Sequence, residues 1–589
     1  MKKRSYLALL LASMMTVSVV LTGCGGSSAG SAAGTDSASQ AESSASAEGG
    51  ADEVSHDEEM TIEIYDVAAN YQGEQTGWFG KVLKDKFNIK LNIIAPQVSG
   101  DANSLYQTRT ASGNLGDIVI LDNADMQDCV DAGLIVDIGD VIGSYENLSK
   151  YSEQINQFNG SMDGVEDGSI YAIPCQMNTN GPTAFMGITA DSAPKLPWDY
   201  YTELGSPEMK TIDDLLQVLA DMQAAHPTNE AGDPAYAISM WKDWDGTSIA
   251  NVQQLCYWFG QEVKDSVLLG SDNSITPLTD KEGSYYKALQ FFYKANQMGL
   301  VDPDSATQDW NAVNSKMKEK RVYLHWYNWS VDFWNTPEHG ENRENYMYTP
   351  VEELHFYQKA DPYYGDGRVF GIGSGVDEEK KARILEFLDW YASPEGLTYQ
   401  HDSIEGLIYT VNEDGTYTLT EDGAKRFTAD IQVPEELGGG LWSDGNDQIN
   451  QWIVHGREVN PTTGEPYDAT LWSSTIENNQ TATTKEWSEK YGAENEVDYM
   501  RQNGQLEMVA NINIPLPSDT TDIALIRSQC GDLVCDTSWR MAFAADDAEF
   551  EQMWDDMCTQ LEGLGWSELV AFDTEKQQVI VDARIASEQ

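Results

Sequence analysis

Residues 60–66 read MTIEIYD, a stretch in which isoleucine alternates with polar or aromatic residues. Such a period of two is typical of a β-strand. Residues 89–94 (IKLNII) alternate in the same way, and residues 117–121 (DIVIL) form a short apolar run. Residues 78–87 and 125–132 have the composition of helices that separate or follow these strands. This order predicts βαβ units around a mostly parallel sheet, in which ligands bind beyond the carboxyl ends of the strands.

Farther along the chain, helical and extended segments continue to alternate. Apolar residues recur at helical spacing in residues 211–222, 285–292, 384–391 and 550–564, and residues 321–326 form another strand pattern. A chain of 589 residues is too long for one ordinary core at about 100 to 200 residues per domain. The sequence therefore predicts an α/β protein with at least two lobes.

The composition excludes several classes of function. Asp and Glu number 96 against 36 Lys and Arg, which gives a formal charge of −60. Such a surface repels phosphate backbones, so we expect no nucleic-acid partner. Seven Cys are too few for a disulfide scaffold of this size.

The first residues have the pattern of an export signal. Lys2, Lys3 and Arg4 precede an apolar run that ends in Leu-Thr-Gly-Cys at Cys24. This ending resembles a bacterial lipobox, in which the cysteine sulfur is acylated, so residues 1–24 are interpreted as a lipoprotein signal peptide. Residues 25–59 are rich in Ser, Ala and Gly and are interpreted as a flexible linker. We expect a body anchored through lipidated Cys24 on the extracytoplasmic face of a bacterial membrane.

Several motifs then occur in an informative order. Residues 116–121 (GDIVIL), 131–138 (DAGLIVDI) and 167–174 (DGSIYAIP) resemble the first lobe of the sugar-type solute-binding proteins of ABC importers, the family of maltose-binding protein. Residues 382–396 (ARILEFLDWYASPEG) and the segment 549–566 are similar to a large Gram-positive lipoprotein branch of that family. Each motif is weak by itself, but together they span nearly the whole chain after Cys24.

The resemblance implies a two-lobed, type II periplasmic-binding-protein-like fold. Each lobe would hold a mostly parallel sheet flanked by helices, with the ligand cleft between the lobes. The first lobe would comprise residues 60–173 and 325–405, and the second residues 174–324 and 406–589. Proteins of this family act as monomers without a cofactor, capture a solute by hinge closure and deliver it to an ABC permease, which implies a binding protein and not an enzyme.

Tryptophan is the residue that favours a sugar as the solute. The chain has 17 Trp against 15 Phe. An indole offers an apolar face and one N–H donor, which match the C–H face and the hydroxyl rim of a pyranose. The resemblance places a cleft aromatic directly after the strand at 321–326. The aromatic candidates for ligand binding are Trp241, Trp244, Trp310, Trp326 and Trp329. Trp554 lies on an amphipathic helix face and is expected in the core.

Polar ligand candidates follow predicted strand ends or come from the resemblance. Asp122 and Asn123 follow one strand, Gln176 and Asn178 follow Pro174, and Glu405 belongs to an Ile-Glu-Gly motif that the family shares. Carboxylate and amide groups can bind sugar hydroxyls. The alternative for the first four residues is a role in helix capping or turn hydrogen bonding.

Motifs for catalysis or metal binding are not found. The seven His show no His-Glu-x-x-His pattern, and Cys530 and Cys535 have no zinc-like partners, which favours free or disulfide-linked structural thiols. Two alternatives to an oligosaccharide receptor stay open. One is a binding protein for a peptide or another small polar solute. The other is a secreted acidic glycoside hydrolase, because carboxylate separation in space, which decides that mechanism, cannot be read from sequence.

Overall fold

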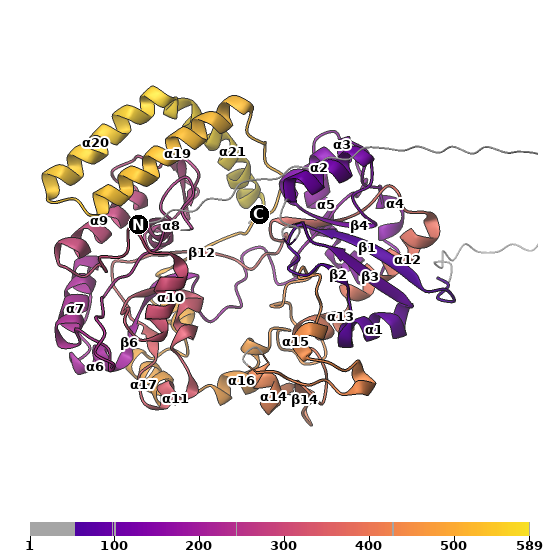
Figure 1. Cartoon of the computed structure of the whole chain (residues 1–589), viewed down its shortest axis with the longest axis horizontal. Coiled ribbons are helices and arrows are strands. Elements are labelled where there is room, and N and C mark those ends of the chain that lie inside the picture. Colours follow the sequence, from indigo (N-terminus) through magenta and orange to yellow (C-terminus); the bar gives the residue numbers. More distant parts are fainter. Residues whose placement is uncertain (1–53, 97, 99–101, 243, 427–428, 588–589) are drawn as a thin grey trace, which may run out of the picture. The chain divides into compact units, whose positions relative to one another are not determined.

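The computed structural model describes residues 54–96, 98, 102–242, 244–426 and 429–587 (Figure 1). The expected signal segment, Cys24 and most of the expected linker lie outside these residues. Within the described chain, no helix is both long and apolar enough to cross a membrane.

One half of the fold, here called the first lobe, is built on a six-stranded sheet. Its strand order is β2-β3-β1-β4-β13-β5. The strands are β1 (Met60–Asp66), β2 (Gly73–Glu74), β3 (Ile89–Ile94), β4 (Ile118–Asp122), β5 (Ile173–Pro174) and β13 (Arg368–Ile372). The central strand β1 pairs in parallel with β3 and β4, as expected from the βαβ pattern, whereas the other pairs are antiparallel.

The period-two pattern of these strands decides which helices cover each face of the sheet. Ile62 and Ile64 are buried on the face that also buries Trp78 of α1. Tyr65 and Val119 are buried on the opposite face. Figure 1 shows α1 and α12 on one side of this sheet and α2 and α3 on the other. The helices of this lobe are α1 (Gly77–Phe87), α2 (Ala102–Ser112), α3 (Asn123–Asp131), α4 (Gly139–Ile142), α5 (Ser152–Gly160), α12 (Glu378–Tyr391) and α13 (Pro394–Leu397).

The second lobe surrounds a separate and larger hydrophobic core. Its strands form the antiparallel sheets β10-β6-β11 and β7-β8-β9 and the parallel pair β12–β16. Parallel bridges join Tyr236 to Val322 and Ile238 to Val301. The strands are β6 (Ser192–Pro197), β7 (Gln261–Lys264), β8 (Val267–Gly270), β9 (Ile275–Pro277), β10 (His325–Tyr327), β11 (Tyr346–Tyr348), β12 (Phe356–Lys359) and β16 (Leu506–Val509).

Helices pack around these strands and complete the second core. They are α6 (Trp198–Glu203), α7 (Ile212–Ala225), α8 (Ala250–Cys256), α9 (Ser284–Gln297), α10 (Trp310–Lys318), α11 (Pro337–Glu341), α17 (Ala482–Tyr491), α18 (Glu496–Gln502), α19 (Thr521–Ala542), α20 (Asp547–Leu564) and α21 (Trp566–Ser587). Trp554 of α20 is buried, as its helical spacing predicts. Cys530 and Cys535 both lie on α19 as free thiols.

The expected lobe boundaries and the observed cores differ in two segments. Residues 325–360 belong to the second core, because β10 and β11 both pair with β6. Residues between 406 and 472 pack on the first lobe, where Ile449 and Tyr467 enter its core and Trp472 joins an adjoining cluster. This part contains β14 (Tyr409–Val411), β15 (Tyr417–Leu419), α14 (Glu421–Lys425) and α15 (Trp442–Gly445), and α16 (Ser473–Asn478) follows it.

The last residues of the expected linker belong to the folded body. His56 Nε2 lies 2.7 Å from Glu386 Oε2, and Asn88 Nδ2 donates to the His56 carbonyl at 2.8 Å. Arg383, which is buried in α12, donates to the carbonyl of Ser55. Residues 54–59 therefore fasten the start of the body to α12 and to the loop before β3.

Candidate functional site

Six aromatic rings of the second lobe pack against one another, some of them exposed, and are here called the aromatic platform. Its members come from three segments and are Trp241, Trp244, Trp310, Tyr327, Trp329 and Phe333. Neighbouring ring centroids lie 4.8 Å apart for Trp244 and Trp310, and 5.3 Å apart for Trp310 and Trp329. Trp244 is 40% exposed and Trp329 is 37% exposed. Large apolar rings left in water at one place mark a surface that binds something.

The strand β10 and the turn after it decide which ring is exposed. Along β10, Trp326 points into the second core, where it is 1% exposed and stacks 5.8 Å from Trp241. Tyr327 is half-buried, and the 3₁₀ turn Asn328–Phe333 then carries Trp329 to the surface. Trp241 is also fully buried. Of the five predicted tryptophans, Trp244, Trp310 and Trp329 thus face the surface or its edge, while Trp241 and Trp326 support them from below.

A carboxylate holds the loop that carries Trp244. Asp245 accepts a hydrogen bond from Trp539 Nε1 at 2.6 Å through one oxygen and from the backbone N–H of Ala250 at 2.9 Å through the other. Both oxygens of Asp245 are therefore used to join the loop to α19 and α8. Sequence reasoning did not select Asp245, Tyr327 or Phe333. The sequence signal for Tyr327 was its position next to Trp326, because successive side chains of a strand point to opposite faces.

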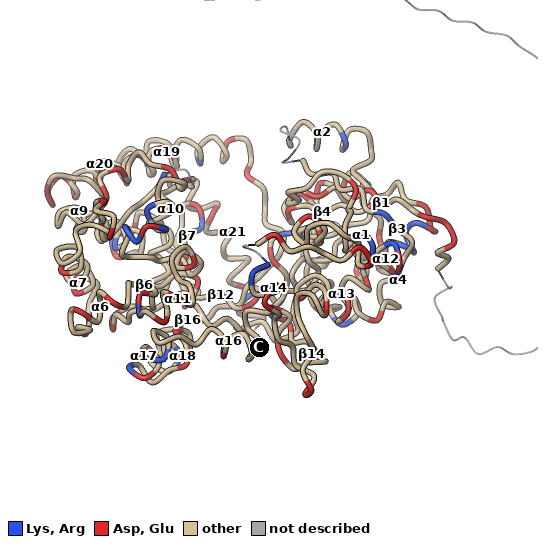
Figure 2. Tube along the Cα trace, turned by 60° about the horizontal axis from the view of Figure 1, so that its bottom comes forward, with Lys and Arg blue, Asp and Glu red and all other residues tan. Residues whose placement is uncertain are grey.

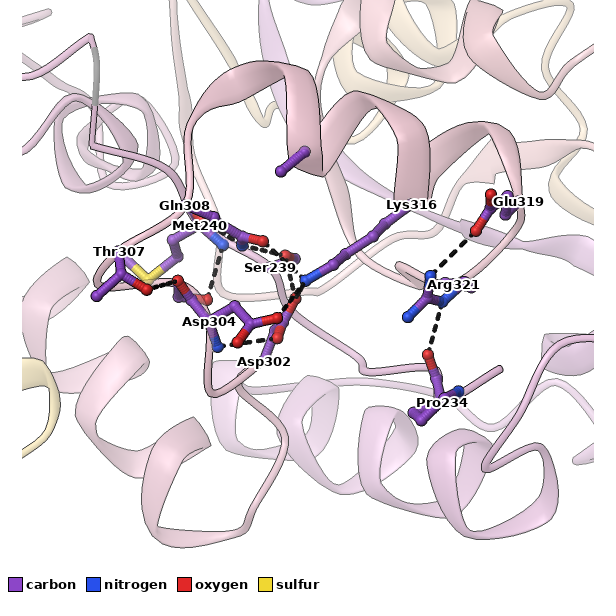
Figure 3. A network of polar contacts seen from close by, with 12 residues as sticks. Pro234, Ser239, Met240, Asp302, Asp304, Thr307, Gln308, Lys316, Glu319 and Arg321 are labelled. Carbon is purple, nitrogen blue, oxygen red and sulfur yellow. Dashed lines mark hydrogen bonds and ion pairs between the residues drawn. The ribbon is translucent and has the colours of Figure 1, made fainter. Parts of the chain in front are cut away.

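A polar network joins the segments that carry Trp241 and Trp310, and Figure 3 shows its side chains. Gln308 Nε2 donates to Ser239 Oγ and to the Met240 carbonyl, both at 2.8 Å. The Met240 N–H donates to Ser305 Oγ at 3.1 Å. Since Met240 precedes Trp241 and Gln308 lies two residues before Trp310, these bonds hold the two indoles at a centroid distance of 4.9 Å.

Lys316 of α10 closes this network from the other side. Its Nζ lies 2.5 Å from Asp302 Oδ2, 2.8 Å from Gln308 Oε1 and 3.1 Å from Asp304 Oδ2. Figure 3 shows the Lys316 side chain reaching back from the helix to these acceptors. Asp302 is 1% exposed and also accepts from Ser239 Oγ at 2.8 Å. A buried carboxylate needs such partners, so Lys316 fixes the orientation of α10 and with it Trp310.

The predicted polar residues of the first lobe do not form one group with the platform. Asp122 is exposed and lies 3.2 Å from Arg368 Nε, and Asn123 Nδ2 donates to Asn513 Oδ1 at 2.8 Å. Asn178 is fully buried, and its Oδ1 accepts from the backbone of Asn180. Asp122 thus forms a surface ion pair, Asn123 links two chain segments, and Asn178 stabilises a turn.

Gln176 and Glu405 have backbone roles. Gln176 has a φ of 60° and donates its N–H to the Trp452 carbonyl at 2.7 Å. Glu405 is exposed in a turn and forms a backbone bridge with Tyr409. No contact of either side chain points to a ligand.

A buried carboxyl group at the carboxyl end of β1 was not selected from the sequence. Asp66 is fully buried, and burial raises its pKa from 3.8 to about 7. One oxygen accepts from the Ala68 N–H at 2.8 Å, and the other has no hydrogen-bond partner among the described residues. Asp447, which accepts from the Tyr391 hydroxyl, also has a pKa raised by burial, to about 6. The signal for Asp66 was its position as the last residue of the stretch MTIEIYD.

A cavity of about 920 Å³ lies elsewhere, between the segment around α16 and helices α17 and α18. No residue of the aromatic platform lines it. The rings of Tyr348 and Trp487 line this cavity, and both are buried. Trp487 Nε1 donates to the Tyr348 carbonyl at 2.7 Å. The cavity therefore lacks the exposed aromatic faces that distinguish the platform.

Charge does not mark the site. Figure 2 shows Asp and Glu spread over both lobes, and Lys and Arg in both lobes as well, for example beside α10 and α17 and beside β3 and α12. Across the part of the chain that the structure describes, no three His, Cys, Asp or Glu side chains are arranged to hold a metal ion.

Comparison with known proteins identifies the family to which the chain belongs. The bacterial extracellular solute-binding protein family matches residues 79–435, which is more than half of the chain. The chain is a bacterial extracellular solute-binding protein. The family resemblance read from the sequence motifs is thus confirmed.

Two curated relatives match this solute-binding protein over part of their length. The fructooligosaccharide ABC transporter substrate-binding protein FusA of Streptococcus pneumoniae serotype 4 (strain TIGR4) is 25% identical over 37% of this chain and 40% of its own length. The polygalacturonan/rhamnogalacturonan-binding protein YtcQ of Bacillus subtilis (strain 168) is 22% identical over 55% of this chain and 61% of its own length. The matched part spans less than two thirds of either relative.

The solved structures confirm the fold over nearly the whole chain. The structure of Streptococcus pneumoniae FusA in complex with kestose is similar with a TM-score of 0.57 at 16% identity, covering 88% of this chain and 99% of that one. The solute-binding protein accordingly has the type II fold that the sequence motifs predict. At this identity the likeness shows the fold alone.

Proposed function

We propose that this solute-binding protein is the extracellular receptor of an ABC importer and captures an oligosaccharide. The observation that carries the proposal is the aromatic platform, where Trp244 and Trp329 expose large ring faces beside Trp310. Stacking on indole faces suits the C–H faces of sugar rings, and several adjacent rings suit a chain of sugars. The names of both relatives refer to oligo- or polysaccharides, which supports the same class of solute.

In this proposal the second lobe supplies the stacking surface and the first lobe closes over it. The closed form gains stability only when the ligand touches both lobes, so closure depends on ligand. The protein acts as a monomer and releases the sugar to a membrane permease without changing it. Residues 1–24 direct export, and lipidated Cys24 holds the body at the extracytoplasmic face of the membrane.

Two other functions were compatible with the sequence. A peptide or another small polar solute would be bound mainly by charged or backbone-pairing groups, whereas the platform exposes the indoles of Trp244 and Trp329. A glycoside hydrolase would need two carboxyl groups free to act on one glycosidic bond. The carboxylate beside Trp244, Asp245, already uses both oxygens to hold its loop, which supports a receptor.

A thermal-shift screen of the purified protein tests the proposal. The ligands are neutral and acidic oligosaccharides, monosaccharides, short peptides and amino acids. A ligand at about 100 times its dissociation constant adds about 2.7 kcal/mol to the free energy of unfolding. We expect oligosaccharides to stabilise the protein and to be recovered intact. Stabilisation by peptides alone, or cleavage of the sugar, would refute the proposal.

A further inference from the structure

Three cationic side chains of the second lobe surround a single buried carboxylate. Glu262 of β7 is 7% exposed, and its Oε1 lies 3.0 Å from Lys264 Nζ and 2.7 Å from Lys359 Nζ. Arg584, in the last turn of α21, completes the group. Lys264, Lys359 and Arg584 are here called the cationic cluster.

Arg584 is held next to the carboxylate without pairing with it. Its Nη2 donates to the Tyr357 hydroxyl at 2.5 Å, and that hydroxyl in turn donates to Glu262 Oε2 at 3.1 Å. Arg584 is 3% exposed, and its Nε and Nη1 have no hydrogen-bond partner among the described residues. Tyr257 donates to Glu262 Oε1 at 3.2 Å, so both carboxylate oxygens already accept hydrogen bonds.

Glu262 is the carboxylate in direct contact with the two lysines, and the charges of Asp191 and Asp366 act on Lys359 without an ion pair. Burial alone would raise the pKa of Glu262, but the charges of Lys264 and Lys359 outweigh burial and lower that pKa, so Glu262 counts as one full negative charge. The helix dipole of α21 places about half a negative charge at its C-terminal end, which offsets part of the positive charge of Arg584. For Lys264, the attraction of Glu262 would raise the pKa, yet burial and the neighbouring cations Lys359 and Arg584 lower it overall. Arg584 is the buried cation of the cluster and forms no ion pair among the described residues, and such a charge favours an additional anion nearby.

The two lysines are accessible to such an anion. The side chain of Lys264 is 34% exposed and that of Lys359 is 31% exposed. An ammonium group has three N–H donors, and one donor on each lysine suffices for Glu262. The remaining donors are available at the surface, with the buried guanidinium of Arg584 adding to the positive potential.

Hydrogen bonds connect the cationic cluster to the aromatic platform. Gln358, next to Lys359 in β12, exchanges two hydrogen bonds of 2.9 Å with Asp191. The Asp191 carbonyl accepts from the N–H of Asn328 at 3.4 Å, and Asn328 lies between Tyr327 and Trp329. Lys359 is thus connected to the platform through three residues, Gln358, Asp191 and Asn328.

We propose that Lys264 and Lys359, supported by Arg584, form an anion subsite that binds the carboxylate of an acidic oligosaccharide stacked on the aromatic platform. This inference rests on the proposed function and specifies its class of solute. The formal charge of −60 does not oppose it at short range, because salt at about 0.15 M screens exposed charges beyond about 8 Å.

Calorimetric titrations of the full-length protein with matched sugars test the subsite. The ligands are oligomers of galacturonate, guluronate and glucuronate, each paired with its carboxyl-reduced, neutral counterpart of the same linkage and length. We expect at least one acidic oligomer to bind about tenfold more tightly than its neutral partner, with a preference that declines as salt is raised. If neutral sugars bind as tightly as the acidic ones in every pair, the subsite is refuted while the proposed function stands. If no sugar in these pairs or in the thermal-shift screen binds, the proposed function itself fails.

Variants locate the preference on the cluster. Lys264→Met and Lys359→Met should each abolish most of the preference for the acidic sugar and leave the affinity for the neutral sugar within about twofold. Glu262→Gln removes the competing carboxylate and should increase the preference, which a merely structural role of the cluster would not do. The matched control is Lys294→Met, which removes an exposed lysine paired with Asp213 at 2.7 Å on the same lobe.

Inorganic phosphate separates a sugar carboxylate from a small free anion. Phosphate alone should give little stabilisation, because it lacks the stacking contribution of the platform. Stabilisation by phosphate that is lost in Lys264→Met, together with no preference for acidic sugars, would assign the cluster to a free anion and overturn the sugar subsite. Circular dichroism of each variant shows that the compared proteins are folded.

Discussion

Two tryptophans three residues apart have opposite environments in this protein. Trp326 is 1% exposed and Trp329 is 37% exposed. The alternation of side chains along β10 turns Trp326 into the core, and the 3₁₀ turn that follows carries Trp329 outward. The same residue type is therefore part of the core at one position and an exposed ring of the aromatic platform at the other.

Substitution of Trp329 should weaken sugar binding and leave the fold intact. Loss of one stacking ring at a binding surface typically costs roughly 1 to 3 kcal/mol. We expect Trp329→Ala to lose that much affinity by calorimetry with the best oligosaccharide of the screen. Trp334→Ala is the control, because Trp334 is half-buried and stacks on His339 outside the platform. Equal losses in both variants would contradict the assignment of the site.

Trp326→Ala should mainly reduce stability, in contrast to Trp329→Ala. Removing a buried indole leaves a cavity, which costs about 3 to 5 kcal/mol. Trp554→Ala, on α20, should show a loss of the same order because Trp554 is also 1% exposed. Urea denaturation measures both values. A normal free energy of unfolding for Trp326→Ala would show that this ring does not pack as the structure indicates.

Asp66 should make stability depend on pH. Burial raises its pKa from 3.8 to about 7, so the folded protein retains a proton that the unfolded chain loses above pH 4. The free energy of unfolding should then fall as pH rises toward 7, by up to about 1.4 kcal/mol per pH unit. Asp66→Asn keeps an oxygen for the Ala68 N–H and should flatten this slope, except for the part that Asp447 contributes.

Urea denaturation between pH 5 and 8 checks the slope. Asp85→Asn is the control, because Asp85 is an exposed carboxylate on α1. If Asp66→Asn and the parent protein show parallel pH profiles, the raised pKa of Asp66 is incorrect.

At the scale of single elements, α10 connects the aromatic platform to the second core. Asp309 caps its first turn by accepting from the Ala312 N–H, Trp310 follows on the platform, and Lys316 reaches back to Asp302. Asp309, Trp310 and Lys316 lie at or within one short helix. A change at Lys316 should therefore shift the Trp310 ring.

Lys316→Met should destabilise the protein and weaken sugar binding without touching the sugar. It leaves the buried carboxylate of Asp302 without its cation, which costs about 3 kcal/mol or more. The double variant Lys316→Met/Asp302→Asn removes that charge and should recover part of the stability. Thermal denaturation and calorimetry measure the two effects. A double variant as unstable as the sum of both single variants would show that the pair is not coupled.

At the scale of the whole molecule, closure distinguishes a receptor from a rigid enzyme. A ligand that touches both lobes favours the closed form. Small-angle scattering should therefore give a smaller radius of gyration with the screened oligosaccharide than without it. A radius that stays the same at saturation, together with cleavage of the sugar, would support the hydrolase alternative.

The proposed lipid anchor also concerns the whole molecule. Cys24→Ser should release the protein from the membrane or leave its precursor unprocessed, because a serine cannot form the thioether-linked lipid. Cell fractionation measures the distribution. A variant that is processed normally and stays as membrane-bound as the parent would refute the lipobox interpretation.

The first lobe could be predicted from sequence because its signals are local. Alternation in the stretch MTIEIYD and in residues 89–94 specifies strands whose two faces are buried by different helices, and the structure pairs these strands in parallel as expected. The family motifs add the two-lobed fold, because their order along the chain is more specific than any single motif. Burial of Trp554 follows from helical spacing in the same way.

The lobe assignment of residues 325–360 and the composition of the site depended on tertiary structure. The local sequence does not determine which sheet a short strand such as His325–Tyr327 joins. In the structure this strand pairs with β6, which places it in the second lobe. The sequence could show that tryptophans are abundant and clustered near 326, but not that Trp241 and Trp326 lie beneath Trp244, Trp310 and Trp329. The cationic cluster unites residues 264, 359 and 584, which lie far apart along the chain. Exposure and charge balance are properties of neighbours in space, so only the folded chain determines them.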